Sequence, residues 1–505
     1  MSALQKQNKY SRLVTNTLLL GISSFSSKIL SFLLTKLYTS VLSEAMWSEA
    51  DAVVQTANLL IPLMTLGIAQ AVIRFGLDKD IPSENVFTNG FVTILLGLAG
   101  ILLLSPVFSL APHLNGNIIL LLIYMLTSSM RLLFCQFVRS QMLIKLYAVD
   151  GILATLYTVL FNVLFLVKWQ MGVTGYLLAT IATDLLSALG LFIIARLWRY
   201  IKFGGMDKTL FVQMLKYSLP LVPATISWWL ANASDRFFIM YMVGGEANGL
   251  YVAASKPPGL VSAVSTFFTE AWQISAVTDG QDEDRGRFFS TVYGALMAVA
   301  FLIGGGLILF SKIIVRMLVS RTSYHAAWIY VPLLAISSVF TFLQSFMSSV
   351  FVVEKKSSLS LYSVLIGAAT SIALNATLIP FIGVFGACIA NLTSSVVIFL
   401  VRVFMARKFI KINYQPLKLI VNSALIMAEA LIMMMQLSYW PIWCGAILLV
   451  LVALNGSALL KTVQQMLKKP RKKQESQTEP PAKTATTSEK WVWHKGQGNT
   501  KEPWE

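Results

Sequence analysis

Long apolar runs separated by short polar joints fill the sequence from about residue 12 to the late 450s. Each run reaches the length of about 20 residues that an α-helix needs to cross a bilayer. Hydrophobic residues make up 56% of the chain and charged residues only 12%, so one soluble globule cannot bury this much apolar surface. We therefore expect an all-α integral membrane protein with about fourteen transmembrane helices, at 12–38, 49–76, 87–109, 117–140, 146–168, 173–198, 217–243, 247–276, 288–311, 325–352, 357–381, 384–409, 417–436 and 439–462.

Lys and Arg gather in alternate joints between these runs, as they do at 196–216 and 402–418. Cytoplasmic loops carry such an excess, so both termini are expected in the cytoplasm. The basic start precedes an apolar run longer than a secretory leader, and we interpret it as a retained first helix. This topological signal also accounts for most of the net charge of +17. Nucleic-acid binding is therefore not expected.

The three cysteines and three histidines do not form a catalytic or metal-binding pattern. Cys135, Cys388 and Cys444 lie inside apolar runs, and the histidines are scattered over joints and the tail. Buried cysteines of this kind usually pack as small apolar residues. We expect no catalytic residues, no metal and no cofactor.

The chain repeats itself with an offset of roughly 200 residues. Asn162 is followed by Gly-Val-Thr-Gly at 172–175, and Asn375 by Gly-Val-Phe-Gly at 383–386. A second repeated segment is Glu-Ala-Asp at 49–51, which recurs as Glu-Ala-Asn at 246–248. Parallel repeats of this kind are typical of transporters whose substrate binds between the halves.

The repeat predicts four parts of the chain. The first two are six-helix lobes that face each other with pseudo-two-fold symmetry. An extra helix pair follows, and the composition changes after about residue 463 to a basic stretch rich in Pro, Thr, Ser and Glu, typical of disorder. The predicted parts are 1–205, 206–412, 413–462 and a disordered cytoplasmic tail at 463–505.

Ionisable side chains inside apolar spans are costly and usually face a wet cavity or a partner. Lys28 lies near the middle of the first span, Asp235 and Arg236 lie in the outer half of the seventh, and Lys256 lies in the eighth. Cations at this depth suit an anionic substrate such as a phosphate or pyrophosphate head group. The alternative is a structural ion pair, for instance of Asp235 with Lys256 or with Lys28.

Other polar groups in the spans give weaker signals. Arg74 and Arg131 are expected to face the same space as substrate-binding residues, and Glu270 and Asp184 are candidates for coupling or ion pairing. Asp150, Asp184 and Glu429 are interpreted either as hydrogen-bonding groups between helices or as proton sites. Pro257 and Pro258 must break or kink the eighth span.

The residues of the seventh and eighth spans resemble those of bacterial polysaccharide (O-antigen-type) flippases. The resemblance rests on YSLPLVP from Tyr217, WWLANASDRFF from Trp228 and GLYVAASK from Gly249, together with the paired Gly-x-x-Gly corners. These flippases belong to the multidrug/oligosaccharidyl-lipid/polysaccharide exporter superfamily. The resemblance covers residues 10–462 and implies two six-helix bundles in a V, with an alternating-access cavity between them. The substrate-binding role that this resemblance implies carries over to Asp235, Arg236 and Lys256. Lys28 fits the cavity position only by its depth in the first span.

The implied substrate is an oligosaccharide on undecaprenyl pyrophosphate, flipped from the inner to the outer leaflet of the bacterial cytoplasmic membrane. The implied partners are this lipid-linked anionic glycan, the bilayer, and polysaccharide polymerases or glycosyltransferases of the same pathway. Fourteen spans also occur in lipid II flippases, so a lipid II or sporulation-type flippase is the main alternative. A multidrug/cation antiporter is a further alternative. A membrane-embedded glycosyltransferase is disfavoured because no joint is long enough for a catalytic domain.

Overall fold

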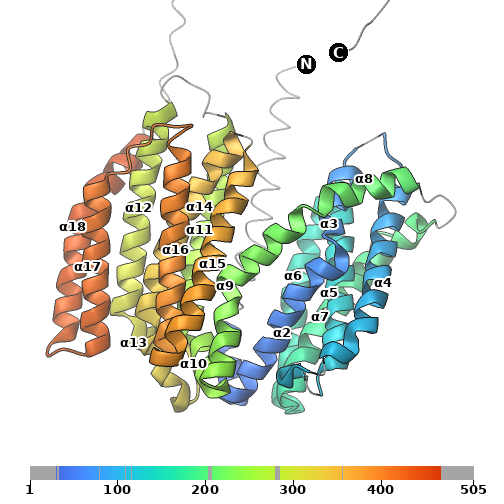
Figure 1. The fold of residues 1–505 in the computed structure, drawn as a ribbon, viewed down its shortest axis with the longest axis horizontal. Helices are drawn as coiled ribbons and strands as arrows, with labels where there is room; N and C mark the ends of the chain where they lie inside the picture. The colour runs from blue at the N-terminus through green and yellow to red at the C-terminus, as the bar shows by residue number, and fades with distance from the viewer. Residues whose placement is uncertain are drawn as a thin grey trace, which may run out of the picture. The chain divides into compact units, whose positions relative to one another are not determined.

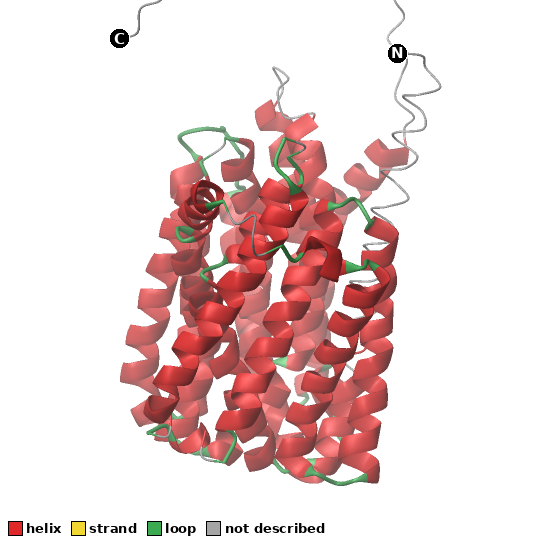
Figure 2. Ribbon diagram, turned by 90° about the vertical axis from the view of Figure 1, so that its right-hand side faces the viewer, coloured by secondary structure: helices red, strands yellow, loops and turns green. Residues whose placement is uncertain are grey.

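The structure is a computed structural model that describes residue 30 and residues 33–78, 80–108, 110–114, 116–202, 207–278, 285–354 and 356–467. All regular elements in these ranges are helices (Figure 2), which confirms the predicted all-α class. The α-helices are α2 (Glu44–Thr65), α3 (Ile68–Gly76), α4 (Ser83–Phe108), α5 (Ile118–Ser140), α6 (Ile144–Asn162), α7 (Gly172–Ile194), α8 (Lys208–Ser218), α9 (Leu221–Met242), α10 (Gly245–Ala254), α11 (Lys256–Thr278), α12 (Arg285–Leu309), α13 (Ser311–Leu318), α14 (Val331–Val353), α15 (Ser357–Ile382), α16 (Val384–Ala406), α17 (Pro416–Met435) and α18 (Trp440–Leu467).

Nine helices of the described ranges are long and apolar enough to cross a bilayer, and α2 with α3 makes a tenth if that bent pair is one span. α9 falls short of the same hydropathy because Trp, Ser and Asn side chains and the Asp235–Arg236 pair interrupt its apolar surface. The first expected span, 12–38, lies largely outside the described residues. The chain is thus a multi-pass membrane protein, and the count of about fourteen spans remains a prediction.

Two expected spans are broken by local backbone chemistry. Leu66 and Gly67 adopt positive φ angles of 51° and 66°, and the chain bends by 55° between α2 and α3. α10 ends at Ala254 and α11 begins at Lys256, so Pro257 and Pro258 occupy the first turn of a new helix, where a missing N–H is tolerated. The predicted break of the eighth span is therefore confirmed.

Another expected span starts later than predicted. The span at 325–352 is preceded by a 3-10 helix, Thr322–Ile329, and the α-helix begins only at Val331. Pro332 lies in its first turn and marks the start of α14 rather than a bend within a longer helix.

The two Gly-x-x-Gly corners each begin with a glycine at nearly the same positive φ angle. Gly172, the first residue of α7, and Gly383, the N-cap of α16, have φ angles of 58° and 56°, which favour glycine. Gly175 and Gly386 then approach main-chain atoms of the preceding helical segment closely. The internal repeat thus corresponds to two equivalent helix–corner–helix units.

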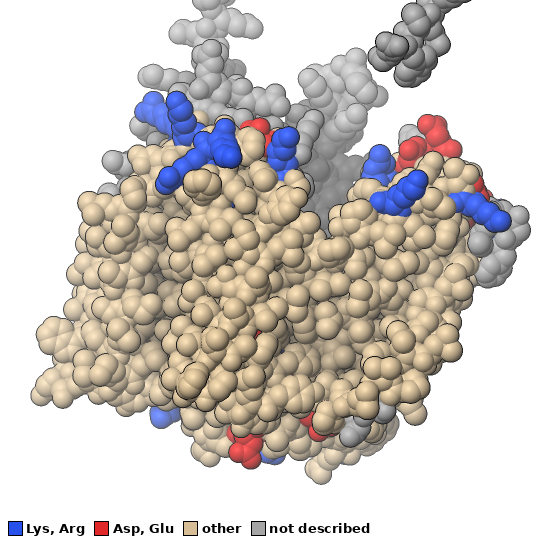
Figure 3. Space-filling view, in the orientation of Figure 1, with Lys and Arg blue, Asp and Glu red and all other residues tan. Residues whose placement is uncertain are grey.

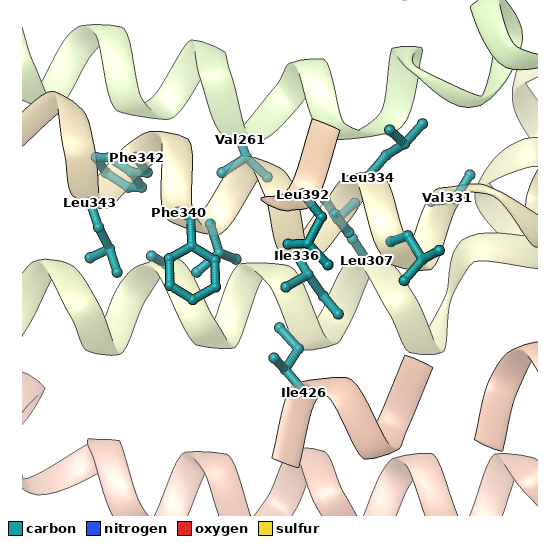
Figure 4. Packing of buried hydrophobic residues seen from close by; sticks show 14 of the residues in the cluster. Val261, Leu307, Val331, Leu334, Ile336, Phe340, Phe342, Leu343, Leu392 and Ile426 are labelled. Atoms are coloured by element: carbon teal, nitrogen blue, oxygen red, sulfur yellow. The ribbon is translucent and has the colours of Figure 1, made fainter. Parts of the chain in front are cut away.

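The helices pack in two groups around two apolar cores, and the second core also includes Trp47 of α2 and residues of α17. The first group, α2–α7, is drawn in blue and cyan in Figure 1, and the second group, α9–α16, in green to orange. Figure 4 shows the second core, where Val261 of α11, Leu307 of α12, Phe340 of α14 and Ile426 of α17 converge. α8 packs against α3 and α4 of the first group, whereas α9 packs against α15 of the second.

Lys and Arg side chains gather at one end of both groups, at the top of Figure 3. The joint between α7 and α8 contains the exposed cations Arg196 and Lys202, and the joint between α16 and α17 contains Arg407, Lys408 and Lys411. This distribution follows the alternation of joints along the sequence.

Candidate substrate-binding site between the helix groups

Charged residues from both helix groups meet where α2 packs against α9 and α10 (Figure 1). We call this set the inter-group cluster. It consists of Asp51, Asp235, Arg236, Tyr251, Lys256 and Asn391.

Arg236 of α9 forms an ion pair with Asp51 of α2. Its Nη1 atom donates to both carboxylate oxygens of Asp51, at 2.7 Å each. The side chains are only 17% and 8% exposed, so the pair is shielded from solvent on both sides. The pair joins the first helix group to the second across 185 positions of sequence.

Asp235 accepts hydrogen bonds from three directions. The main-chain N–H of Arg236 donates to Oδ1 at 2.9 Å, the hydroxyl of Tyr251 donates to Oδ2, and Nδ2 of Asn391 lies 3.4 Å from Oδ2. The sequence alternative was an ion pair of Asp235 with Lys256 or Lys28. Among the described residues Asp235 forms no ion pair with Lys256, its hydrogen-bond donors are neutral, and the ion pair of this cluster joins Arg236 to Asp51. Lys28 lies outside the described residues, so its pairing with Asp235 stays a prediction.

Lys256 lies at the break between α10 and α11 and is half-buried. Its Nζ atom lies 5.4 Å from the centre of the Trp47 ring of α2, a distance at which the ring face attracts the ammonium group. The charges of Arg236 and Asp51 also act on it. Among the described side chains, none supplies a carboxylate within ion-pair distance of Lys256.

A close helix contact holds this cluster in place. Nδ2 of Asn248 in α10 donates to Oγ of Ser48 in α2 at 2.8 Å. At Gly249 an added Cβ atom would lie 2.2 Å from the main-chain oxygen of Glu44, so only glycine permits this approach. The Glu-Ala-Asp and Glu-Ala-Asn repeat segments are therefore neighbours in space as well as equivalents in sequence.

Arg131 lies in a second polar cluster, inside the first helix group. Its Nη1 atom lies 2.8 Å from Asp184, its Nη2 atom 3.8 Å from Asp150, and its Nε donates to Ser187 at 2.9 Å. Ser128 donates to Asp184 as well. A cavity of about 340 Å³ between α5, α6 and α7 is lined by Ser128, Arg131, Asp150 and Asp184.

The remaining sequence candidates lie elsewhere. Arg74 is exposed in the last turn of α3, so it does not join either polar cluster. Glu270 belongs to α11, but its side chain is outside the described part of the structure, as is Lys28. The structure thus brings together Asp235, Arg236 and Lys256 in one cluster, and Arg131 and Asp184 in another.

Sequence reasoning missed Asp51 and Tyr251 as members of the site. The repeat of Glu-Ala-Asp as Glu-Ala-Asn singled out the segment that contains Asp51, but it gave no information about which residue pairs with the Asp51 carboxylate. The motif that contains Lys256 also contains Tyr251, five positions earlier.

Residues 13–272 match the polysaccharide biosynthesis protein family. The chain belongs to this family. The relative "Uncharacterized membrane protein MJ1375" of Methanocaldococcus jannaschii is 24% identical, over 76% of this chain and 95% of its own length.

Solved structures share the fold of this family member. The lipid II flippase MurJ in an inward closed conformation is similar with a TM-score of 0.63 at 14% identity, covering 89% of this chain and 100% of that one. An inward-facing multidrug resistance MATE transporter reaches 0.59 at 15% identity, covering 77% and 98%. A superfamily transporter from Pyrococcus furiosus reaches 0.55 at 14% identity, covering 78% and 95%. At these identities the similarity establishes the fold.

Proposed function

We propose that this protein is a transporter that flips an undecaprenyl-pyrophosphate-linked oligosaccharide from the inner to the outer leaflet for surface polysaccharide assembly. It works by alternating access between two six-helix lobes, 1–205 and 206–412, with an extra pair at 413–462 and fourteen spans in all. Both termini face the cytoplasm of a bacterial cell, and polymerases or glycosyltransferases of the pathway act beside it.

Lys256 carries the proposal that the substrate is anionic. Its ammonium group is half-buried at a helix break, against a tryptophan of the other helix group, and no described carboxylate lies within ion-pair distance of it. A cation in such surroundings is stabilised by an anion that enters the site. A diphosphate supplies that anion and offers several acceptor oxygens.

Arg236 gives the substrate a way to act on the contact between the helix groups. A phosphate accepts hydrogen bonds from a guanidinium in the same manner as the Asp51 carboxylate does. A diphosphate held by Lys256 would compete with Asp51 for Arg236 and weaken the contact between α2 and α9. Substrate binding would thereby favour the rearrangement that alternating access requires, because a ligand shifts a conformational equilibrium only by its differential affinity for the two states.

The remaining sequence candidates complete the proposed path. Lys28 is a further cation of the site because of its depth in the first span. Arg74, at the end of α3, binds the head group as the substrate enters. Arg131 binds it inside the first lobe. Glu270 and Asp184 are the proposed coupling residues.

A lipid II flippase is the second candidate function. The fold similarity to MurJ extends over 89% of this chain, whereas the MATE structures cover 77–78%. The α17–α18 pair is an addition to two lobes of six helices, which favours a flippase with an extra pair over a multidrug antiporter.

Export of surface glycan in cells lacking the native transporter tests the proposal. Lys256→Gln and Lys28→Gln/Lys256→Gln should abolish export at normal protein levels, whereas the matched control Lys256→Arg should retain it because the positive charge remains. Unchanged export by the double variant contradicts the cationic site. Depletion that stops wall synthesis but leaves surface glycan intact assigns the protein to lipid II instead.

A further inference from the structure

The α17–α18 pair buries a carboxylic acid that has no part in the proposed transport site. Glu429 lies in the second half of α17 and is 0% exposed. At a rise of 1.5 Å per residue it is about 9 Å along the axis from the end of α17 at Met435. It therefore sits within an apolar span rather than at its surface.

Glycines of α12 make room for this side chain. α12 packs against α17, and Gly304, Gly305 and Gly306 lie on it in sequence. A Cβ atom at Gly305 would lie 3.0 Å from Oε2 of Glu429 and 3.1–3.2 Å from Leu448 and Leu451 of α18. The carboxyl group thus fills a space between three helices that any larger residue at Gly305 would reduce.

Neither carboxyl oxygen of Glu429 has a hydrogen-bond partner. α12 contributes glycines, α14 contributes Val339 next to Gly304, and α18 contributes two leucines. Among the described side chains, the titratable neighbour is Cys444, whose thiol lies 3.7 Å from the main-chain oxygen of Glu429 rather than from its carboxyl group. Within the described part of these helices, no Lys, Arg or His faces the acid.

In the described part of the same helix pair, the other buried polar side chains have hydrogen-bond partners. Asn422 and Asn455 are both 0% exposed, and each amide donates to the other, at 3.2 and 3.1 Å. The isolation of Glu429 is therefore a local property of this acid.

An isolated carboxylate in such surroundings is strongly disfavoured. Transfer of an ionised carboxylate into an apolar medium without a partner costs so much that such groups neutralise instead. A metal cation cannot supply the neutralising charge, since hard cations need about six oxygen ligands and this site offers glycine, leucine and a thiol. A proton removes the charge without any further ligand.

We propose that Glu429 is a proton-binding site and that its proton holds the α17–α18 pair against α12. While the acid is neutral, it fits beside Gly305. Loss of the proton creates a charge that only water can solvate, so α17 must separate from α12 or admit water. The docking of the extra helix pair thus depends on a proton independently of the transported substrate.

Infrared spectroscopy of the full-length protein in lipid nanodiscs tests proton binding. A protonated carboxylic acid has a carbonyl stretch distinct from that of a carboxylate, so subtracting the spectrum of Glu429→Gln from that of the wild type isolates this group. We expect the acid band in the difference spectrum at neutral pH and its loss at alkaline pH. The matched control Glu246→Gln, at an exposed glutamate of α10, should remove no acid band at neutral pH. A difference spectrum without the acid band at neutral pH overturns the proposal.

Hydrogen exchange of main-chain amides tests the effect on docking. In the wild type, exchange in α17 and in the Gly304–Gly306 segment of α12 should rise as the pH becomes alkaline, beyond the intrinsic pH dependence of exchange. Glu429→Gln cannot ionise and should show no such excess. An equal excess in both proteins contradicts the role of the proton in docking. Substrate flipping is not the readout, so the result is separate from that of the transport proposal.

Discussion

The ion pair between Arg236 and Asp51 predicts a large and non-additive loss of stability. Asp51→Asn removes the negative charge but keeps the shape, leaving a guanidinium that is 17% exposed without its counter-ion. Two unit charges about 4 Å apart interact by about 4 kcal/mol at an effective dielectric constant of about 20, against about 1 kcal/mol in water. Removal of one partner from a buried pair costs about 3–5 kcal/mol for the same reason. We expect Asp51→Asn and Arg236→Gln each to fall in this range.

A double-mutant cycle in mixed micelles, with unfolding induced by a denaturing detergent, measures the pair itself. The double variant should lose less than the sum of the single losses, since each single change leaves the other partner buried and unpaired. Lys202 and Glu84 provide a matched control at the same N–O distance of 2.7 Å, because their side chains are 58% and 38% exposed. Breaking that exposed pair should cost less than about 1 kcal/mol. Additive losses at Asp51 and Arg236, or losses as small as those of the control, refute the reasoning.

The remaining predictions concern the helix contact, the second polar cluster and pH. Gly249→Ala should destabilise the protein by about 1–3 kcal/mol in the same unfolding assay, because its Cβ would lie 2.2 Å from a main-chain oxygen of α2. Gly259→Ala, where an added Cβ meets nothing within 4 Å, should not. Arg131→Met leaves two carboxylates without their cation and should cost about 3–5 kcal/mol, and adding Asp184→Asn should recover part of the loss. His113, in the α4–α5 joint, contacts Thr56 and Tyr241, and burial lowers its pKa. As the pH drops, this histidine therefore takes up a proton in the unfolded protein before it does so in the folded protein. The free energy of unfolding should fall as the pH drops through about 6.5. His113→Gln should make the free energy of unfolding depend less on pH in this range.

Local features of the sequence were predicted well because their causes are local. The length of the apolar runs identified most spans. The missing N–H group of proline explains the break at Pro257, and the positive φ angles at Gly172 and Gly383 explain why glycine begins each corner. The start of α14 was missed because hydropathy does not distinguish a 3-10 turn from an α-helix.

The partners of the charged residues were not predictable in the same way. The depth of Arg236 marked it as exceptional, but its partner Asp51 is 185 positions away, and only the contact of α2 with α9 and α10 brings them together. Arg131 and Asp184 were each singled out, yet hydropathy gives no information about which faces of α5 and α7 meet. Pairing depends on tertiary packing.

Flipping by the purified protein in proteoliposomes tests the central claim most directly. The substrate is a fluorescent undecaprenyl-diphosphate glycan, and a reagent confined to the outside reports how much of it has crossed the bilayer. We expect the wild type and Lys256→Arg to flip this lipid, Lys256→Gln to lose most of the activity, and a neutral glycolipid with the same tail to cross no faster than in empty vesicles. Equal flipping of the neutral and the diphosphate lipid, or full activity of Lys256→Gln, would contradict a transport site for an anionic lipid-linked glycan.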